Sequence, residues 1–274
     1  MLASFLLSLR EGIEAALIIG ILLGALRQMK RPEYIPTVWL GTVSAGVISL
    51  LVAVALTTLG LEMKDPSEAI FEGFTMLIAA GLLTWMIFWM SRTARTLRSD
   101  IEANVQRASQ VGGRALFFVA FIAVLREGIE LALFLTASVF ASDALQATLG
   151  AILGLGTAIL IGWTIFATTV RLDLRRFFQA TGFLLILFAA GLVAHGVHEF
   201  NEVGWIPPVI EHLWDVSAIV SDTSTLGQLL GALFGYNPTP SLTEMVAYFA
   251  YFMVVLLGLR SANKPRPVTA DQRA

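Results

Sequence analysis

The pentapeptide Arg10-Glu11-Gly12-Ile13-Glu14 occurs a second time as Arg126-Glu127-Gly128-Ile129-Glu130, and each copy lies inside a long apolar stretch. On a helix with 100° between residues, Arg10, Glu11 and Glu14 point to one narrow face. A charged side chain at the centre of a bilayer costs about 2.5–3.5 kcal/mol on insertion scales, so six of them on two helices need an explanation. The doubled pentapeptide therefore predicts two related membrane helices whose charged faces can meet.

Composition places the chain in the membrane class. Hydrophobic residues make up 57% of the 274 residues and charged residues only 14%, whereas soluble domains carry about 25% charged residues. The mean hydropathy is +0.78. The chain has no cysteine, which excludes disulfides, thiolate metal sites and thiol catalysis, so a bound metal would take oxygen or imidazole ligands. The sequence lacks a Gly-x-x-x-x-Gly-Lys-Ser/Thr loop, and we expect neither ATP hydrolysis nor another enzymatic activity.

About seven segments are long and apolar enough to cross a membrane as helices, which takes roughly 20 residues. They are Leu2–Leu26, Thr37–Gly60, Ala69–Met90, Ala115–Ala141, Thr148–Val170, Ala180–His198 and Leu242–Leu259. The first is too long and too charged for a signal peptide, so we expect it to be retained. No polar linker divides the chain. Residues 1–260 are therefore predicted to form one transmembrane domain, followed by a cytoplasmic tail at 261–274.

The charges between these segments predict how the chain lies in the membrane. Most of the 18 Lys and Arg residues follow the first, third, fifth and seventh segments. Because basic loops stay in the cytoplasm, the N-terminus is expected outside and the C-terminus inside. The opposite side is acidic and includes an outer segment at 201–240. Its apolar run Leu226–Phe234 is expected to lie along the membrane surface or to dip back into it.

A second, weaker echo indicates an internal repeat. Ala79-Ala80-Gly81-Leu82-Leu83 resembles Ala189-Ala190-Gly191-Leu192-Val193, at nearly the same separation as the two pentapeptides. Repeat one would cover about 1–91 and repeat two about 115–200, while the helix at 242–259 stands apart. Three helices per unit is an odd number, so the second unit would enter from the opposite face. This is an inverted repeat, which in transporters places the binding site near the midplane between the two copies.

The charged faces predict a cation site with six members, namely Glu11, Glu14, Glu127 and Glu130 as ligands and Arg10 and Arg126 as their counter-ions. If each arginine only neutralised the glutamate four residues on, one glutamate per motif would remain and the site would keep a formal charge of −2. Such a site suits hard cations, including ferric iron, and also protons. The alternatives are a carrier of another hard divalent cation, or a membrane redox or structural subunit.

A second group of metal-binding residue types lies towards the outer side. His195, His198, Glu199 and Glu202 fall within about one helical face and could receive a metal first, with Glu72 lining the entrance. The same side chains could equally be the polar ends of membrane helices. Haem ligation by both histidines is disfavoured, because a spacing of three residues places both imidazoles on the same side of a haem.

At the paired motifs the chain resembles the ferric iron permease family, the oxidase-dependent iron transporters. Other segments that carry the resemblance are Glu72-Gly73-Phe74, Trp85-Met86-Ile87-Phe88-Trp89-Met90, His198-Glu199-Phe200, Leu213-Trp214-Asp215 and Phe234-Gly235-Tyr236. The resemblance covers nearly the whole chain.

This resemblance implies a multi-pass permease that imports iron across the bacterial inner membrane. The iron would enter as Fe³⁺, with Fe²⁺ as the alternative, after oxidation by a partner protein. It further implies periplasmic or extracellular iron-oxidising or iron-delivering partners, a role for the motif glutamates in iron handling, no permanently bound cofactor and no nucleic-acid partner.

The repeat also predicts the geometry of the site. The two motif helices should be adjacent and antiparallel, with Gly12, Ala16, Gly128 and Ala132 permitting their close approach. Their carboxylate oxygens should lie about 4–6 Å apart, because motifs some 18 and 22 Å deep in a core of roughly 30 Å overlap. Transport would then be a rocking of one three-helix unit against the other around a shared site.

Overall fold

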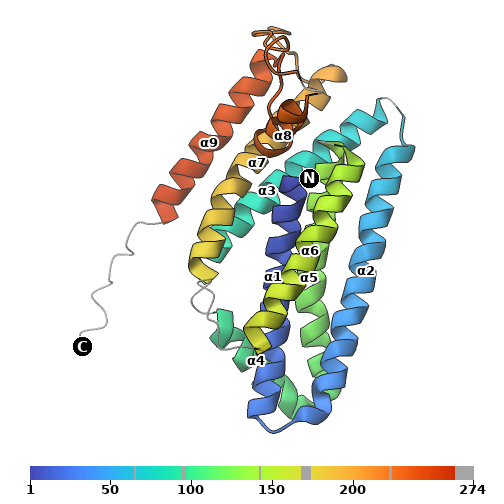
Figure 1. The fold of residues 1–274 in the computed structure, drawn as a ribbon, viewed down its shortest axis with the longest axis vertical. Coiled ribbons are helices and arrows are strands. Elements are labelled where there is room, and N and C mark those ends of the chain that lie inside the picture. Colours follow the sequence, from blue (N-terminus) through green and yellow to red (C-terminus); the bar gives the residue numbers. More distant parts are fainter. Residues whose placement is uncertain (65, 94–96, 142, 168–173, 222–223, 263–274) are drawn as a thin grey trace, which may run out of the picture.

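The computed structural model describes residues 1–274 except 65, 94–96, 142, 168–173, 222–223 and 263–274 (Figure 1). Its described residues form helices and no strands, which confirms the predicted all-α class. The helices are α1 (Leu2–Gln28), the short 3-10 helix η1 (Pro32–Tyr34), α2 (Ile35–Glu62), α3 (Ser67–Thr93), α4 (Leu97–Val111), α5 (Gly113–Phe140), α6 (Ala144–Ala167), α7 (Leu174–Glu202), α8 (Thr225–Phe234) and α9 (Leu242–Ala262). Nearly all of the predicted tail lies outside the described residues.

Five of these helices are long and apolar enough to cross a membrane, namely α2, α3, α6, α7 and α9. Helices α1 and α5 are as long, with 27 and 28 residues, but carry the charged motifs. Each of the seven predicted segments coincides with one of these seven helices to within a few residues where the structure describes it. Many of the side chains of α2, α6 and α9 are apolar and exposed, as expected where helices face lipid.

Helix α4 was not predicted. It is polar and amphipathic, and at 15 residues it is too short to span a bilayer, so a search for apolar segments passes over it. Its apolar side chains Val105 and Ala108 are buried against the ends of α1 and α5, in one cluster with Leu26 and Leu116. The connection between the two predicted repeats is therefore a packed helix and not an open loop.

The motif helices α1 and α5 lie side by side and run in opposite directions, as predicted (Figure 1). At one end the hydroxyl of Ser4 lies 2.7 Å from that of Ser138. At the other end Leu26 of α1 and Leu116 of α5 share an apolar cluster. The motifs lie between these two points, so the antiparallel packing brings them to the same level.

Six of the helices pair in a regular way. Helix α1 packs along α6 and α5 packs along α2, while α3 packs along α7. Exchanging the members of the two predicted repeats, α1 with α5, α2 with α6 and α3 with α7, reproduces the same set of pairs. A two-fold relation between the repeats would produce this pattern of contacts.

Small residues make the long contacts between α1 and α6 and between α5 and α2. Helix α6 presents Gly150, Gly154, Ala158 and Gly162 at intervals of four residues, and these positions contact α1. On the other side, Gly41 and Ser49 of α2 lie against α5. Small residues four apart let two helix backbones approach closely in a membrane.

The motif glycines do permit close helix packing, but the prediction that they bring α1 against α5 was wrong, because they face α6 and α2. A Cβ atom on Gly12 would lie 2.6 Å from the Cβ of Ala158 on α6, and one on Gly128 would lie 2.6 Å from the Cβ of Ser49 on α2. Ala16 likewise faces Gly162 of α6. The reason is angular: Gly12 lies 160° around the helix from both Arg10 and Glu14, so the glycine faces away from the charged side.

The outer segment folds back along α7. Helix α8 ends at Gly235, which has φ 65°, and the backbone of Gly235 lies directly against Gly191. Gly191 is eleven residues before the end of α7, which is about 16 Å along the helix. The apolar run that was expected to lie on the surface or dip back thus reaches well below the outer end of α7.

We predict that Gly154→Ala lowers the melting temperature and the folded yield. The new Cβ would lie 2.8 Å from the Cβ of Ser8 and 2.9 Å from the amide nitrogen of Leu9, so α1 and α6 would have to separate. Gly156, two residues away, has nothing within 4 Å and is the matched control. Gly156→Ala should be neutral or slightly stabilising, because alanine favours a helix over glycine by about 1 kcal/mol. Equal shifts in thermal unfolding of the two purified variants would contradict the packing described.

Candidate metal site

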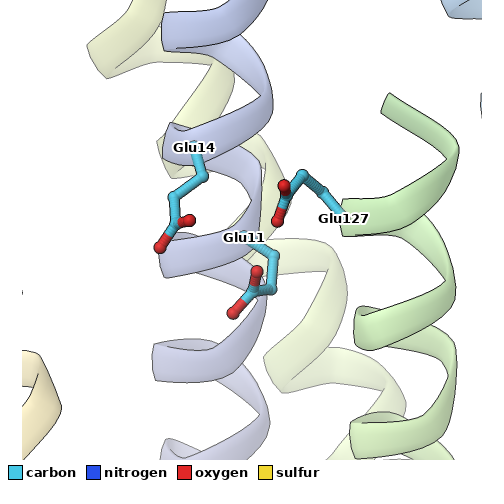
Figure 2. A group of neighbouring side chains, drawn as sticks. All are labelled: Glu11, Glu14 and Glu127. Carbon is cyan, nitrogen blue, oxygen red and sulfur yellow. The ribbon is translucent and has the colours of Figure 1, made fainter. Parts of the chain in front are cut away.

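Three motif carboxylates meet between α1 and α5. Figure 2 shows Glu127 of α5 reaching towards Glu11 and Glu14 of α1, and one oxygen from each lies within 4.8 Å of the other two. All three side chains are buried. Among the residues that the structure describes, no other His, Asp or Glu set of three or more comes together in this way. These oxygens are therefore closer together than the upper end of the predicted range.

Each motif arginine binds the glutamate one helical turn further along. The Nε of Arg10 donates to Oε1 of Glu14 over 3.1 Å, and the Nε of Arg126 donates to Oε1 of Glu130 over 3.0 Å. Arg126 also lies 3.5 Å from Oε1 of Glu127. The i, i+4 pairs that the sequence predicted are therefore present in both motifs.

Glu130 is the predicted ligand that the structure does not bring into the group. It is buried, but its Oε1 is taken by Arg126, and it is not one of the three carboxylates with converging oxygens. The two motifs are thus used unequally, with two glutamates from α1 and one from α5. Equal sequences do not require equal geometry, because each motif packs against different neighbours.

Several buried polar atoms of the site have no hydrogen-bond partner in the protein. Both carboxylate oxygens of Glu11 and the Oε2 atoms of Glu127 and Glu130 are in this position. Ionised carboxylates can only accept hydrogen bonds, so Glu11 and Glu127 cannot satisfy each other unless one of them carries a proton. Leaving a buried carboxylate unpaired is costly, whereas a cation shared by the three oxygens would satisfy all of them.

The two ends of the α1–α5 interface differ in polarity. Towards the N-terminus of α1 the buried hydroxyls of Ser4 and Ser138 contact each other across the interface, while the buried Ser8 lies against Gly154 of α6. Towards the other end the interface is apolar, with Leu22, Leu26, Leu116 and Ala120 in one buried cluster. A cation could therefore exchange water for hydroxyl oxygens on one side of the carboxylates only.

The predicted outer metal-receiving residues are arranged differently from a metal site. His195 Nδ1 lies 3.1 Å from the carbonyl oxygen of Gly191 in its own helix. His198 lies between two carboxylates, with Nδ1 3.0 Å from Glu244 and Nε2 3.4 Å from Glu202. In the described part of the chain these atoms do not form a group of three close ligands.

The other two outer candidates, Glu72 and Glu199, face each other across α3 and α7. Glu72 is close enough to interact electrostatically with Glu68, Glu199 and Glu202. This group gathers acidic side chains at one end of the α3–α7 pair, and its use as a metal-receiving entrance stays a prediction.

Glu244 has a larger part than the sequence indicated. Glu244 lies in the first turn of α9, is buried, accepts hydrogen bonds from Asn237 and from the backbone amide of Ser241, and pairs with His198. Asn201 of α7 adds contacts to Ser241. This network fastens the start of α9 to the end of α7. Its contacts between the two helices join residues 40 and 46 positions apart, so no local pattern predicts them.

The comparisons with known proteins agree with this arrangement. Residues 1–262 match the "Iron permease FTR1 family". The chain belongs to this family. It is 35% identical over 277 residues to the "Ferrous iron permease EfeU" of Shigella sonnei (strain Ss046), covering 100% of both chains. It is 34% identical over 260 residues to the protein of the same name from Yersinia pestis, covering 94% of this chain and 92% of the relative. No solved structure matches.

Membership of this family settles the broad class. The protein is an iron permease, a transporter and not an enzyme, and iron is its transported substrate. With its apolar helices it is a multi-pass protein of the inner membrane. The resemblance noted at the paired motifs is thereby confirmed over the whole chain.

We predict that Arg10→Met lowers the folded yield sharply. Removing one member of a buried ion pair leaves an unpaired charge and typically costs about 3–5 kcal/mol, and Arg10 is almost fully buried against Glu14. The double variant Arg10→Met/Glu14→Met removes both charges and should recover much of the yield. Size-exclusion chromatography of detergent extracts would measure both. A wild-type yield for the single variant would show that Arg10 neutralises nothing important.

Proposed function

We propose that Glu11, Glu14 and Glu127 form the site at which this permease binds iron during transport. The observation that carries the proposal is the convergence of three buried carboxylates, of which both oxygens of Glu11 and one oxygen of Glu127 lack a hydrogen-bond partner. Four motif carboxylates and two guanidiniums leave the region with a formal charge of −2. A multivalent cation would neutralise this charge, while Arg10 and Arg126 limit repulsion when no cation is bound.

We infer further that the ion is Fe³⁺. The donor set consists of carboxylate oxygens with hydroxyls on one side and contains no sulfur, and hard donors favour the harder oxidation state. The iron would be oxidised outside the membrane by a separate periplasmic or extracellular protein. Fe²⁺ is the second candidate, because the relatives named above are described as ferrous iron permeases.

The polarity of the α1–α5 interface supports a direction for transport. If the N-terminus lies outside, as the basic loops predict, the hydroxyls of Ser4 and Ser138 lie on the outer side of the carboxylates. The apolar cluster around Leu26 and Leu116 then closes the inner side. Release of the iron into the cytoplasm would require the α1–α6 pair to move against the α5–α2 pair. This movement fits an inverted repeat that rocks about a central site.

We predict that Glu127→Gln reduces iron uptake at least about 10-fold, the loss that even outer-shell partners of metal ligands can cause. Glutamine keeps the shape of the side chain but removes its charge, so the protein should still fold. Glu33→Gln is the matched control, because Glu33 is exposed in η1 and far along the chain from both motifs. Uptake of radiolabelled iron into cells lacking other iron importers would measure both. Normal uptake by Glu127→Gln would contradict the assignment of Glu127 to the iron site.

The oxidation state needs a separate experiment. Purified protein in vesicles should take up Fe³⁺ supplied as a weak chelate faster than Fe²⁺ held reduced without oxygen. Ga³⁺, which resembles Fe³⁺ and cannot be reduced, should compete with iron. Faster transport of Fe²⁺, unaffected by Ga³⁺, would establish the ferrous alternative and leave the carboxylate site unchanged.

A further inference from the structure

The two motif arginines occupy very different surroundings. Arg10 is walled in, with 1% of its side chain exposed, whereas 36% of the Arg126 side chain is exposed. Both hold the glutamate four residues on, so their pairing does not explain the difference. What differs is the set of groups, other than its carboxylate, that surrounds each guanidinium.

Arg126 already lies over an aromatic face. Its guanidinium carbon is 4.3 Å from the centre of the Trp89 ring and 6.0 Å from that of Trp85, both on α3. The two indole rings are themselves stacked, with an angle of 25° between them. Arg10 has only Phe178 at 5.7 Å. Tryptophan is the aromatic ring that attracts a cation most strongly, and the attraction fades at about 6 Å.

A cation at the three carboxylates would act on both arginines, because Arg10 binds Glu14 at 3.1 Å and Arg126 lies 3.5 Å from Glu127. A multivalent ion bound there would repel each guanidinium and would also take up the carboxylate charge that holds it. Arg10 is enclosed and cannot withdraw, but Arg126 is partly exposed and has an indole face beside it.

We propose that Trp89 is a positioning residue that receives the guanidinium of Arg126 when a metal ion replaces it at Glu127. The proposal rests on the assignment of iron to Glu11, Glu14 and Glu127. The arginine is then a displaceable counter-ion: before the ion arrives it lies against Glu127, Glu130 and the ring, and afterwards it gives up Glu127 and keeps the ring. Trp89 strengthens metal binding without touching the metal, because the guanidinium depends more on the ring once Glu127 binds the ion.

Replacement of Trp89 tests this directly. Trp89→Leu removes the ring face at similar bulk and should weaken Fe³⁺ and Ga³⁺ binding to the purified protein by about 2- to 30-fold, the range expected for a cation–π contact. Trp89→Phe keeps a weaker ring face and should lie between Trp89→Leu and wild type. Trp163→Leu is the control, because Trp163 is a largely exposed residue of α6. Dissociation constants from calorimetry and melting temperatures would be measured for each protein.

A double-mutant cycle separates positioning from structural support. In an Arg126→Gln background there is no guanidinium to receive, so Trp89→Leu should change the dissociation constant less than about 2-fold. An equal loss with and without the arginine would overturn the proposal, since Trp89 would then act only through packing. If Arg126→Gln does not fold, the metal affinities of wild type, Trp89→Phe and Trp89→Leu decide the question. Affinities that fall in this order, at matched melting temperatures, support the proposal, and equal affinities overturn it.

The outcomes also distinguish this proposal from the site assignment. If Glu127→Gln abolishes metal binding but Trp89→Leu binds as tightly as wild type, the site stands and the role of Trp89 falls. If wild-type protein binds neither Fe³⁺ nor Fe²⁺ at the motif glutamates, the site assignment fails and the role of Trp89 falls with it.

Discussion

The structure depends on one constraint, which is that six ionisable side chains, five of them buried and Arg126 partly exposed, come together on two membrane helices. Each arginine binds the glutamate one turn along its own helix, at 3.1 Å for Arg10 and 3.0 Å for Arg126. These pairs allow each helix to enter an apolar environment. Each arginine neutralises only one of the two glutamates in its motif, so the carboxylate charges of Glu11 and Glu127 remain without a counter-ion of their own. The surplus carboxylates have to face each other or a cation, because buried charge without a partner is costly. The proposed metal site thus follows from an incomplete neutralisation.

Bringing the two charged helices together requires close packing on their other sides. Helix α6 lies against α1 and α2 lies against α5 through small residues four positions apart, such as Gly154 on α6 and Ser49 on α2. These contacts hold α1 to α6 and α5 to α2, so that the bundle divides naturally into two pairs that meet at the carboxylates. A transporter that exposes a central site to each side in turn needs such a division. The interface that must change is then the one that carries the charges.

Much of this could be predicted from local sequence. Length and hydropathy locate the helices, the doubled motif locates the site, and the spacing of Arg10 and Glu14 predicts their ion pair. What could not be predicted depends on which helix lies beside which. Gly12 faces α6 instead of α5, Glu130 stays with Arg126, and Glu244 holds His198 across forty-six positions. The repeat of small residues on α6 was visible in the sequence, but its partner was not. Helix α4 was not predicted, because its 15 mostly polar residues do not form an apolar segment long enough to span a membrane.

The most direct measurement of the central claim is the position of bound metal in the protein. A crystal of the iron-loaded permease, measured at the iron absorption edge, should show an anomalous peak within coordination distance of Glu11, Glu14 and Glu127, about 2.0–2.2 Å from carboxylate oxygens if they bind as such ligands usually bind transition metals. Arg126 should at the same time have moved away from Glu127. A peak at the outer group around His198 and Glu244, with none between α1 and α5, would contradict the account.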